Sequence, residues 1–190
     1  LSIPIGAPVK RLSLDQHRRR SLPTLAAVSR LLDQQQYREA ATAASDWTNS
    51  DPSNPFAWFF LGQALDGLRL YSRAIPCYLE AVELEPLYSA AWNHLGLAYI
   101  ETDKLDFARQ AFEEALAINP RDSSAIHGLG LLKARRGDDM GALLEFERAA
   151  YASVEEGEVP NVFVIKKYCA LAQLYKLADK IASCNRIMDA

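Results

Sequence analysis

The chain has 190 residues, of which 49% are hydrophobic and 24% charged, and its formal net charge at pH 7 is −3. This composition suits one domain with a continuous core. No apolar run approaches the roughly 18 residues that a membrane-spanning helix needs, so we expect no transmembrane segment.

The two ends of the chain and its cysteines give hints about processing and cellular compartment. The first residue is Leu1 rather than methionine. Such a start indicates a chain that is cut, processed or fused, which leaves a lost signal peptide or an upstream domain open. The chain ends at Ala190 within a helical pattern, as a piece of a longer protein would. The odd, sparse cysteine count favours a reducing compartment such as the cytoplasm, with a periplasmic or membrane-tethered form as the alternative.

Residues 1–20 differ in charge from the rest of the chain. They hold five basic residues and one acidic residue, a net charge of +4, whereas residues 21–190 hold 16 basic and 23 acidic residues, a net charge of −7. Prolines, a glycine and spaced apolar residues in this segment predict extended chain. Three interpretations stand: a mobile linker, a peptide that binds a groove of its own or a neighbouring chain, and a contact with an anionic membrane or nucleic acid. Basic patches interleaved with aromatic residues are absent elsewhere, so we expect no nucleic-acid partner.

From residue 21 onward, small and aromatic residues recur with a period of 34. Gly62, Gly96 and Gly130 mark the period, and each follows a leucine. The same spacing relates the alanines and aromatic residues that come next: Ala74, Ala108 and Ala142, then Tyr78, Phe112 and Phe146, then Ala81, Ala115 and Ala149. A period of this length indicates stacked copies of one supersecondary unit. We expect the small residues to let the two helices of each unit approach closely.

The repeated pattern resembles the tetratricopeptide repeat, whose signature is W-x2-L-G-x2-Y, then A-x3-F, then P. One unit matches the signature at every element: Trp92, Leu95, Gly96, Tyr99, Ala108, Phe112 and Pro120. Its two neighbours depart from the signature at four positions: Leu65, Ile126, Lys133 and Val154. The register gives the units 21–54, 55–88, 89–122 and 123–156 and, after a break of eight residues, a partial or capping unit 161–190.

The resemblance implies an all-α fold, a right-handed superhelical solenoid of helix-turn-helix units over residues 21–190. No stretch alternates with the period of a strand, so we expect no sheet. The register predicts helix pairs near 22–34/37–49, 55–68/71–84, 89–102/105–118, 123–136/139–152 and 161–177/179–189.

The resemblance also implies a concave face that is built by the first helices of successive units and binds the partner. By register its residues are Phe56, Phe59, Phe60, Gln63, Asn93, His94, Leu97, His127, Leu131 and Arg135. The three phenylalanines are additional to the core-facing positions of their helix, so they are candidate anchors for apolar side chains of a partner. The alternative is that Phe56 and Phe60 only pack against the preceding unit.

Little in the sequence points to an enzyme or a metal site. His94 and His127 project from adjacent first helices, but no acidic residue or cysteine converges on them by spacing. The cysteines, Cys77, Cys169 and Cys184, lack metal or redox spacing, so we expect inert thiols, with a disulfide or a reactive thiol as the alternative. No glycine-rich phosphate loop, nucleophile elbow or H-E-x-x-H motif occurs. We therefore expect no catalysis, no metal and no cofactor.

These observations predict a protein–protein interaction module, an adaptor or scaffold that could resemble a co-chaperone and binds a partner peptide in the concave groove. Family members that hold a chaperone's C-terminal carboxylate use lysine, asparagine and arginine at five register positions. In the register that starts at residue 55, this chain has other residues there: Phe59, Gln63, His94, Ser124 and Gly128. We therefore expect no carboxylate clamp of that type. The alternative function is an assembly subunit that self-associates through its end units, where Val162–Ile165 form an apolar run, or through its N-terminal segment.

Overall fold

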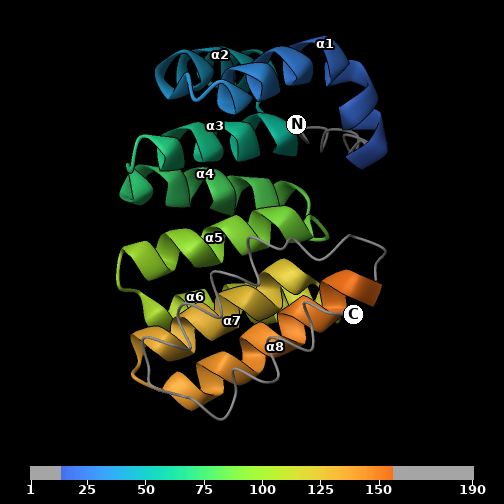
Figure 1. Cartoon of the computed structure of the whole chain (residues 1–190). Coiled ribbons are helices and arrows are strands. Elements are labelled where there is room, and N and C mark those ends of the chain that lie inside the picture. The colour runs from blue at the N-terminus through green and yellow to red at the C-terminus, as the bar shows by residue number, and fades with distance from the viewer. Residues whose placement is uncertain (1–13, 156–190) are drawn as a thin grey trace, which may run out of the picture.

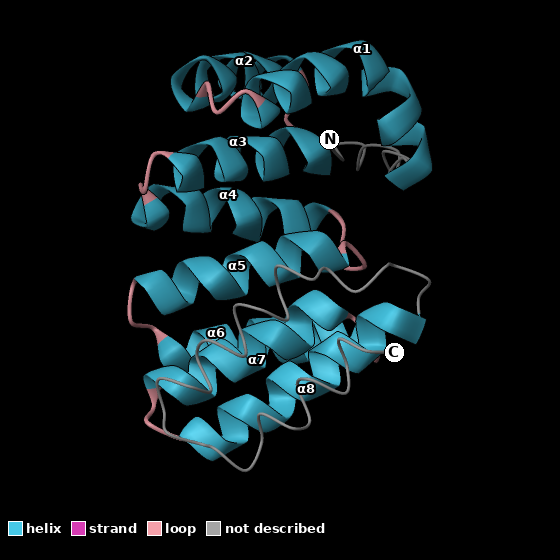
Figure 2. Cartoon of the chain, viewed as in Figure 1, coloured by secondary structure: helices cyan, strands magenta, loops and turns pink. Residues whose placement is uncertain are grey.

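The computed structural model describes the backbone of residues 14–155 and the side chains of residues 24–152. This part of the chain contains eight helices and no strand. The helices are α1 (Leu14–Asp33), α2 (Tyr37–Ser50), α3 (Pro55–Gly67), α4 (Tyr71–Leu84), α5 (Ser89–Glu101), α6 (Leu105–Ile118), α7 (Ser123–Arg135) and α8 (Asp139–Glu155). They stack in chain order into one elongated solenoid (Figure 1), with short connections between them (Figure 2). The predicted all-α solenoid is therefore confirmed for these residues.

The helix pairs follow the 34-residue register closely. From α2 to α8, every helix begins at the predicted residue, and every end lies within three residues of its prediction. The predicted last pair, 161–189, lies outside the described residues, as do residues 1–13.

The start of α1 was predicted wrongly. We expected extended chain up to residue 20, but the helix begins at Leu14. The later start followed from the 34-residue register, which places the first helix of this unit near residue 22. The sequence carries a competing signal, since Ser13 followed three residues later by Gln16 is typical of a capping box. Pro23 lies inside α1 and cannot donate a backbone hydrogen bond, and α1 is bent in Figure 1.

The small residues of the repeat lie where the two helices of a unit meet. A Cβ atom on Gly62 would lie 2.5 Å from the ring of Tyr78 in α4, and one on Gly96 would lie 2.6 Å from the ring of Phe112 in α6. Both rings are fully buried. Glycine at these positions therefore brings the first helix of a unit against the aromatic residue of the second, as the sequence predicted.

The turn within each unit repeats as well. Gln35, Arg69 and Asp103 have φ near +58°, and Gly137 has φ of +79°, so four residues spaced by 34 adopt the left-handed conformation. Glycine reaches this region at no steric cost, whereas other L-residues are strained there.

The first helices lie on one side of the solenoid. Each contacts the first helix of the next unit, α1 with α3, α3 with α5 and α5 with α7. No comparable contacts join the second helices among the described units. The first helices are therefore closer together than the second helices, and the side that they form is the inner, concave one.

A cleft on the first-helix face

The inner side of the first three units holds a cleft of about 500 Å³. It lies between α1, the start of α2, α3 and α5. Its lining residues are Ser29, Leu32, Asp33, Tyr37, Phe59, Phe60, Gln63, Asp66, Gly67 and His94. Three successive units thus contribute to one cavity, which a single helix pair could not form.

Aromatic side chains form the apolar part of the cleft. Phe59 is only 5% exposed and packs against the rings of Tyr88 and His94, with ring centroids 4.9 and 5.2 Å apart. Phe60 is partly buried and stacks on Trp47 of α2 at 6.2 Å. Phe59 is therefore part of the floor that the core supports, and Phe60 forms a wall.

A polar network crosses the floor of the cleft. The Tyr78 hydroxyl donates a hydrogen bond of 2.6 Å to Oδ2 of Asp66, and Nδ1 of His94 lies 3.9 Å from the same oxygen. Nε2 of His94 lies 3.2 Å from the amide nitrogen of Gln63. In the neutral tautomer with its proton on Nδ1, His94 accepts from Gln63 and turns an N–H towards Asp66. Burial, and then the nearby Asp66 carboxylate, raise the pKa of Tyr78 well above its usual value.

The cleft carries acidic side chains without a lysine or arginine to balance them. Asp33 and Asp66 are its two carboxylates, and no lysine or arginine lines it. Among the lining residues only His94 can become cationic. The Asp66 side chain keeps 21% of its surface exposed, and its Oδ1 atom is buried with no donor among the described residues. The cleft is therefore a partly apolar cavity with uncompensated negative charge.

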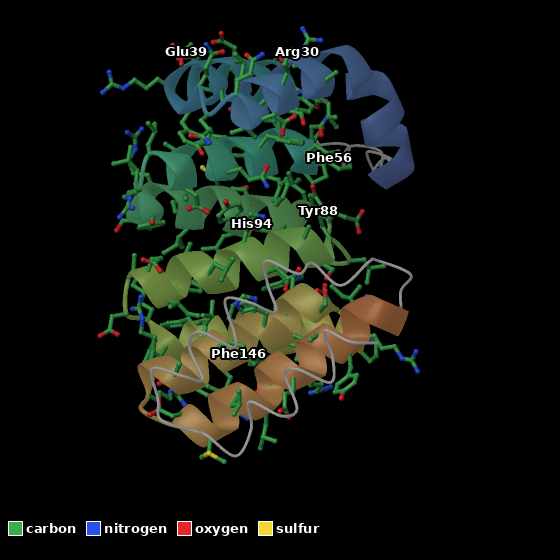
Figure 3. The ribbon with its side chains drawn as sticks, in the orientation of Figure 1. Arg30, Glu39, Phe56, Tyr88, His94 and Phe146 are labelled. Atoms are coloured by element: carbon green, nitrogen blue, oxygen red, sulfur yellow. The ribbon has the colours of Figure 1, made fainter. Side chains whose placement is uncertain are left out.

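Four of the predicted site residues line this cleft: Phe59, Phe60, Gln63 and His94. Phe56 does not. It is 8% exposed and packs with Val28 and Trp47 of the first unit. Its ring and that of Tyr88 meet edge-on, with centroids 5.3 Å apart; both residues are labelled in Figure 3. As an exposed anchor Phe56 was therefore predicted wrongly, because the first unit and the residue before α5 cover it. The alternative, that it only packs against the preceding unit, holds for Phe56, whereas Phe60 packs there and also lines the cleft.

The other predicted residues mostly join neighbouring elements. Asn93 is 7% exposed, and its amide donates 2.9 Å to Oδ2 of Asp122, the N-cap of α7, so it is a buried link between units rather than an open groove residue. His127 is partly buried against the edge of Phe146 at 5.4 Å. The rest lie as follows: Leu97 is exposed, Leu131 is partly buried in the core, and Arg135 pairs with Glu101 at 3.5 Å.

The part of the cleft in the first unit was missed by sequence reasoning. Ser29 precedes Gln63 by 34 residues, so extending the groove register one unit back would have found it. Leu32 precedes Asp66 by 34 residues, a position that the predicted groove residues do not include. Asp33 follows Leu32 directly. Tyr37 carried no such signal, because it opens a second helix, where the register places no groove residue.

A second cleft of about 540 Å³ lies between α2, α3 and α4, away from the first-helix face. Ser45 and Cys77 are among its lining residues. Cys77 is buried, and its burial raises the pKa of the thiol from 9.0 to about 11. Because the thiolate is the reactive form, this cysteine is a poor nucleophile at neutral pH.

No group of three or more histidine, cysteine, aspartate or glutamate side chains within residues 14–155 could hold a metal ion. No helix described there is both long and apolar enough to cross a membrane.

Comparison with known proteins identifies the repeat. A family model described as tetratricopeptide repeat matches residues 25–69, and one described as CABIN1 N-terminal domain matches residues 56–146. The cell division cycle protein 27 homolog of Caenorhabditis elegans is 31% identical over 54% of this chain and 13% of its own length. The anaphase-promoting complex subunit 3 of Schizosaccharomyces pombe is 26% identical over 56% of this chain and 16% of its own length. The chain thus matches less than a fifth of the length of these relatives.

Solved structures show the same architecture. MamA from Desulfovibrio magneticus RS-1 superposes with a TM-score of 0.66, over 89% of this chain and 93% of that one, at 18% identity. At this identity the likeness establishes a common fold.

Proposed function

Because the chain belongs to the tetratricopeptide-repeat family of protein-interaction scaffolds, we propose that it holds a segment of a partner protein in the cleft on its first-helix face, without catalysis. The observation that carries the proposal is the cleft itself, an apolar cavity with a few polar groups, built by three successive units. Cavities of this kind are the usual place for a ligand. Its floor is fixed by packed aromatic rings, so the site is formed before the partner arrives.

The cleft does not suit a chaperone's C-terminal carboxylate. Phe59, Gln63 and His94 stand at three of the positions where clamp-forming relatives carry lysine or asparagine, and Phe59 is buried. The carboxylates of Asp33 and Asp66 would repel an acidic tail. We therefore assign the cleft to an internal or otherwise non-acidic segment.

Panning a library of random peptides against the immobilised chain tests this function. The Ser29→Trp variant fills the cleft, and Ser45→Trp makes the same change in the second cleft. Both serines are partly buried, so the two substitutions are matched in chemistry and exposure. Enriched peptides should bind the parent and Ser45→Trp but not Ser29→Trp. Enrichment that survives Ser29→Trp, or no enrichment at all, would refute groove binding.

A second candidate function, self-association, is favoured by the outer face of α8. Three large apolar residues are exposed there: Met140, Leu144 and Tyr151. The same register positions carry Ser72, Pro76 and Glu83 in α4 and Asp106, Gln110 and Ala117 in α6. All six are exposed although another unit follows each helix, so repeat stacking does not cover this face. An exposed apolar face of this kind is typical of a protein interface.

Light scattering separates this candidate from a monomeric scaffold. If α8 joins two copies, Leu144→Glu should reduce the mass, and Gln110→Glu at the same register position of α6 should not. A parent chain that stays monomeric at high micromolar concentration would rule out self-association as the function.

A further inference from the structure

The polar network on the cleft floor is not needed for stacking the units. Its four members are Gln63, Asp66, Tyr78 and His94. The residues 34 positions later, which take the same places one unit on, are Leu97, Ile100, Phe112 and Gly128. Ile100 and Phe112 are buried there, and the pair of helices closes without a polar group. The fold therefore accepts apolar residues at the positions where the second unit carries polar ones.

Keeping polar groups at such positions costs stability. Buried polar atoms need partners, and Oδ1 of Asp66 is a buried acceptor without a donor among the described residues. The apolar alternative, which the next unit uses, avoids this cost. A role outside the fold would explain why the second unit keeps a carboxylate at the floor of the cleft.

We propose that the cleft selects an arginine side chain of the partner segment, with Asp66 and Asp33 as the groups that bind its charge. The inference rests on the proposed function and specifies its ligand. Both carboxylates line the cavity, no basic residue of the chain lines it, and Asp66 remains partly exposed to it. A cationic side chain is the complement of this arrangement.

Arginine fits this cavity better than lysine. The guanidinium group is planar, so it can stack on an aromatic ring while it donates two hydrogen bonds to a carboxylate. Phe60 and Tyr37 supply rings within this cavity. The exposed carboxylate of Asp33 supplies the acceptor oxygens, and Asp66 adds negative charge from the floor. Leu32 adds apolar surface for the methylene groups of the arginine side chain or for the residue next to it.

The test is an NMR titration of backbone amides with four acetylated, amidated peptides of sequence Gly-Leu-X-Leu-Gly, where X is arginine, lysine, glutamine or glutamate. We expect the arginine peptide to shift amides around Gln63 and His94 and to bind up to about fivefold more tightly than the glutamine peptide. Added salt should weaken the binding of the arginine peptide and leave the affinity of the glutamine peptide unchanged. The Asp33→Asn/Asp66→Asn double variant should lose the preference, whereas Asp46→Asn, a control on the exposed side of α2, should keep it.

A second variant separates binding from folding. Asp66→Ile/Tyr78→Phe introduces the residues that the next unit carries at these positions. It should unfold at the same or a higher urea concentration than the parent, and its preference for the arginine peptide over the glutamine peptide should fall, with only the contribution of Asp33 left. If it loses stability instead, the network is structural and the inference fails.

The remaining outcomes distinguish this inference from the proposed function. Equal binding of all four peptides, with shifts in the cleft that Ser29→Trp abolishes, would leave groove binding intact and overturn arginine selectivity. The absence of shifts with every peptide, or shifts unaffected by Ser29→Trp, would contradict both.

Discussion

Replacing Gly96 by alanine should destabilise the chain, although alanine is the better helix former. Gly96 of α5 faces the fully buried ring of Phe112 in α6, and a Cβ at Gly96 would lie 2.6 Å from two atoms of that ring. A Cβ on Gly128 of α7 would collide with the same edge of the ring. Glycines from two successive units thus enclose Phe112, which leaves the ring little room to move.

Two opposing contributions decide whether Gly96→Ala raises or lowers the free energy of unfolding. Alanine gains about 1 kcal/mol over glycine in a helix interior. The new methyl group would sit about 1 Å inside the usual carbon–carbon contact distance of about 3.5–4 Å, and overpacking of this kind costs about 1–3 kcal/mol. We expect a net loss of up to about 2 kcal/mol, which lowers the urea midpoint by up to about 1 M at a slope of about 2 kcal/mol/M.

The assay is urea unfolding followed by far-UV circular dichroism, with Gly141→Ala as the matched control. A Cβ on Gly141 of α8 would meet the carboxylate of Asp138, the end of a flexible side chain that can rotate away. That rotation gives up the hydrogen bond of 2.9 Å that Oδ1 of Asp138 accepts from the Gly141 amide at the start of α8. Losing such a cap costs about 1 kcal/mol, which offsets the gain in helix propensity, so the control should unfold within about 0.5 kcal/mol of the parent. A Gly96→Ala variant as stable as the parent, or a control that loses as much, would show that the ring contact does not limit packing.

Three further predictions use the same assay. Ala108→Leu, at a fully buried contact of the best-matched unit, should lose about 1–3 kcal/mol; an unchanged midpoint would place Ala108 outside the helix contact. Gly137→Ala should lose about 1 kcal/mol through its left-handed φ alone, since nothing lies within 4 Å, and Gly137→Asn should lose less. Stability should fall as the pH rises from about 9 towards 11, because the raised pKa values of Cys77 and Tyr78 keep protons on the folded chain that the unfolded chain releases. Cys77→Ala should flatten the first part of that decline, and an unchanged decline would exclude the thiol as its cause.

The helix pairs could be predicted from the sequence because each packing position is repeated. A glycine such as Gly62 and an aromatic residue such as Tyr78 have the same spacing in three units, so one register fixes seven helices at once. The start of α1 lies outside that redundancy. There the register places the first helix near residue 22, whereas the local signal of Ser13 and Gln16 favours an earlier start, and no other unit carries a copy of that signal.

The concave face was harder to predict, because the register gives the direction of a side chain but not what covers it. One register position carries Phe59, Asn93 and His127, and each of these side chains contacts a neighbouring element instead of facing open solvent. The residues that cover them, Tyr88 and Asp122 among them, belong to the connections before the next first helix. Such contacts between units do not show in a 34-residue period.

Departures from the repeat say more about function than matches do. A residue that is the same in every unit is explained by the packing that every unit shares, as Gly96 and Phe112 are. Asp66 and Leu144 are different: the first is polar where the next unit has the buried Ile100, and the second is apolar where the preceding unit has the exposed Gln110. Folding of the stack favours an apolar residue at the position of Asp66 and a polar residue at the position of Leu144, so each of these residues departs from what packing requires. Selection for folding alone would remove both, so the cleft floor and the outer face of α8 are the two surfaces where a binding partner would explain the sequence.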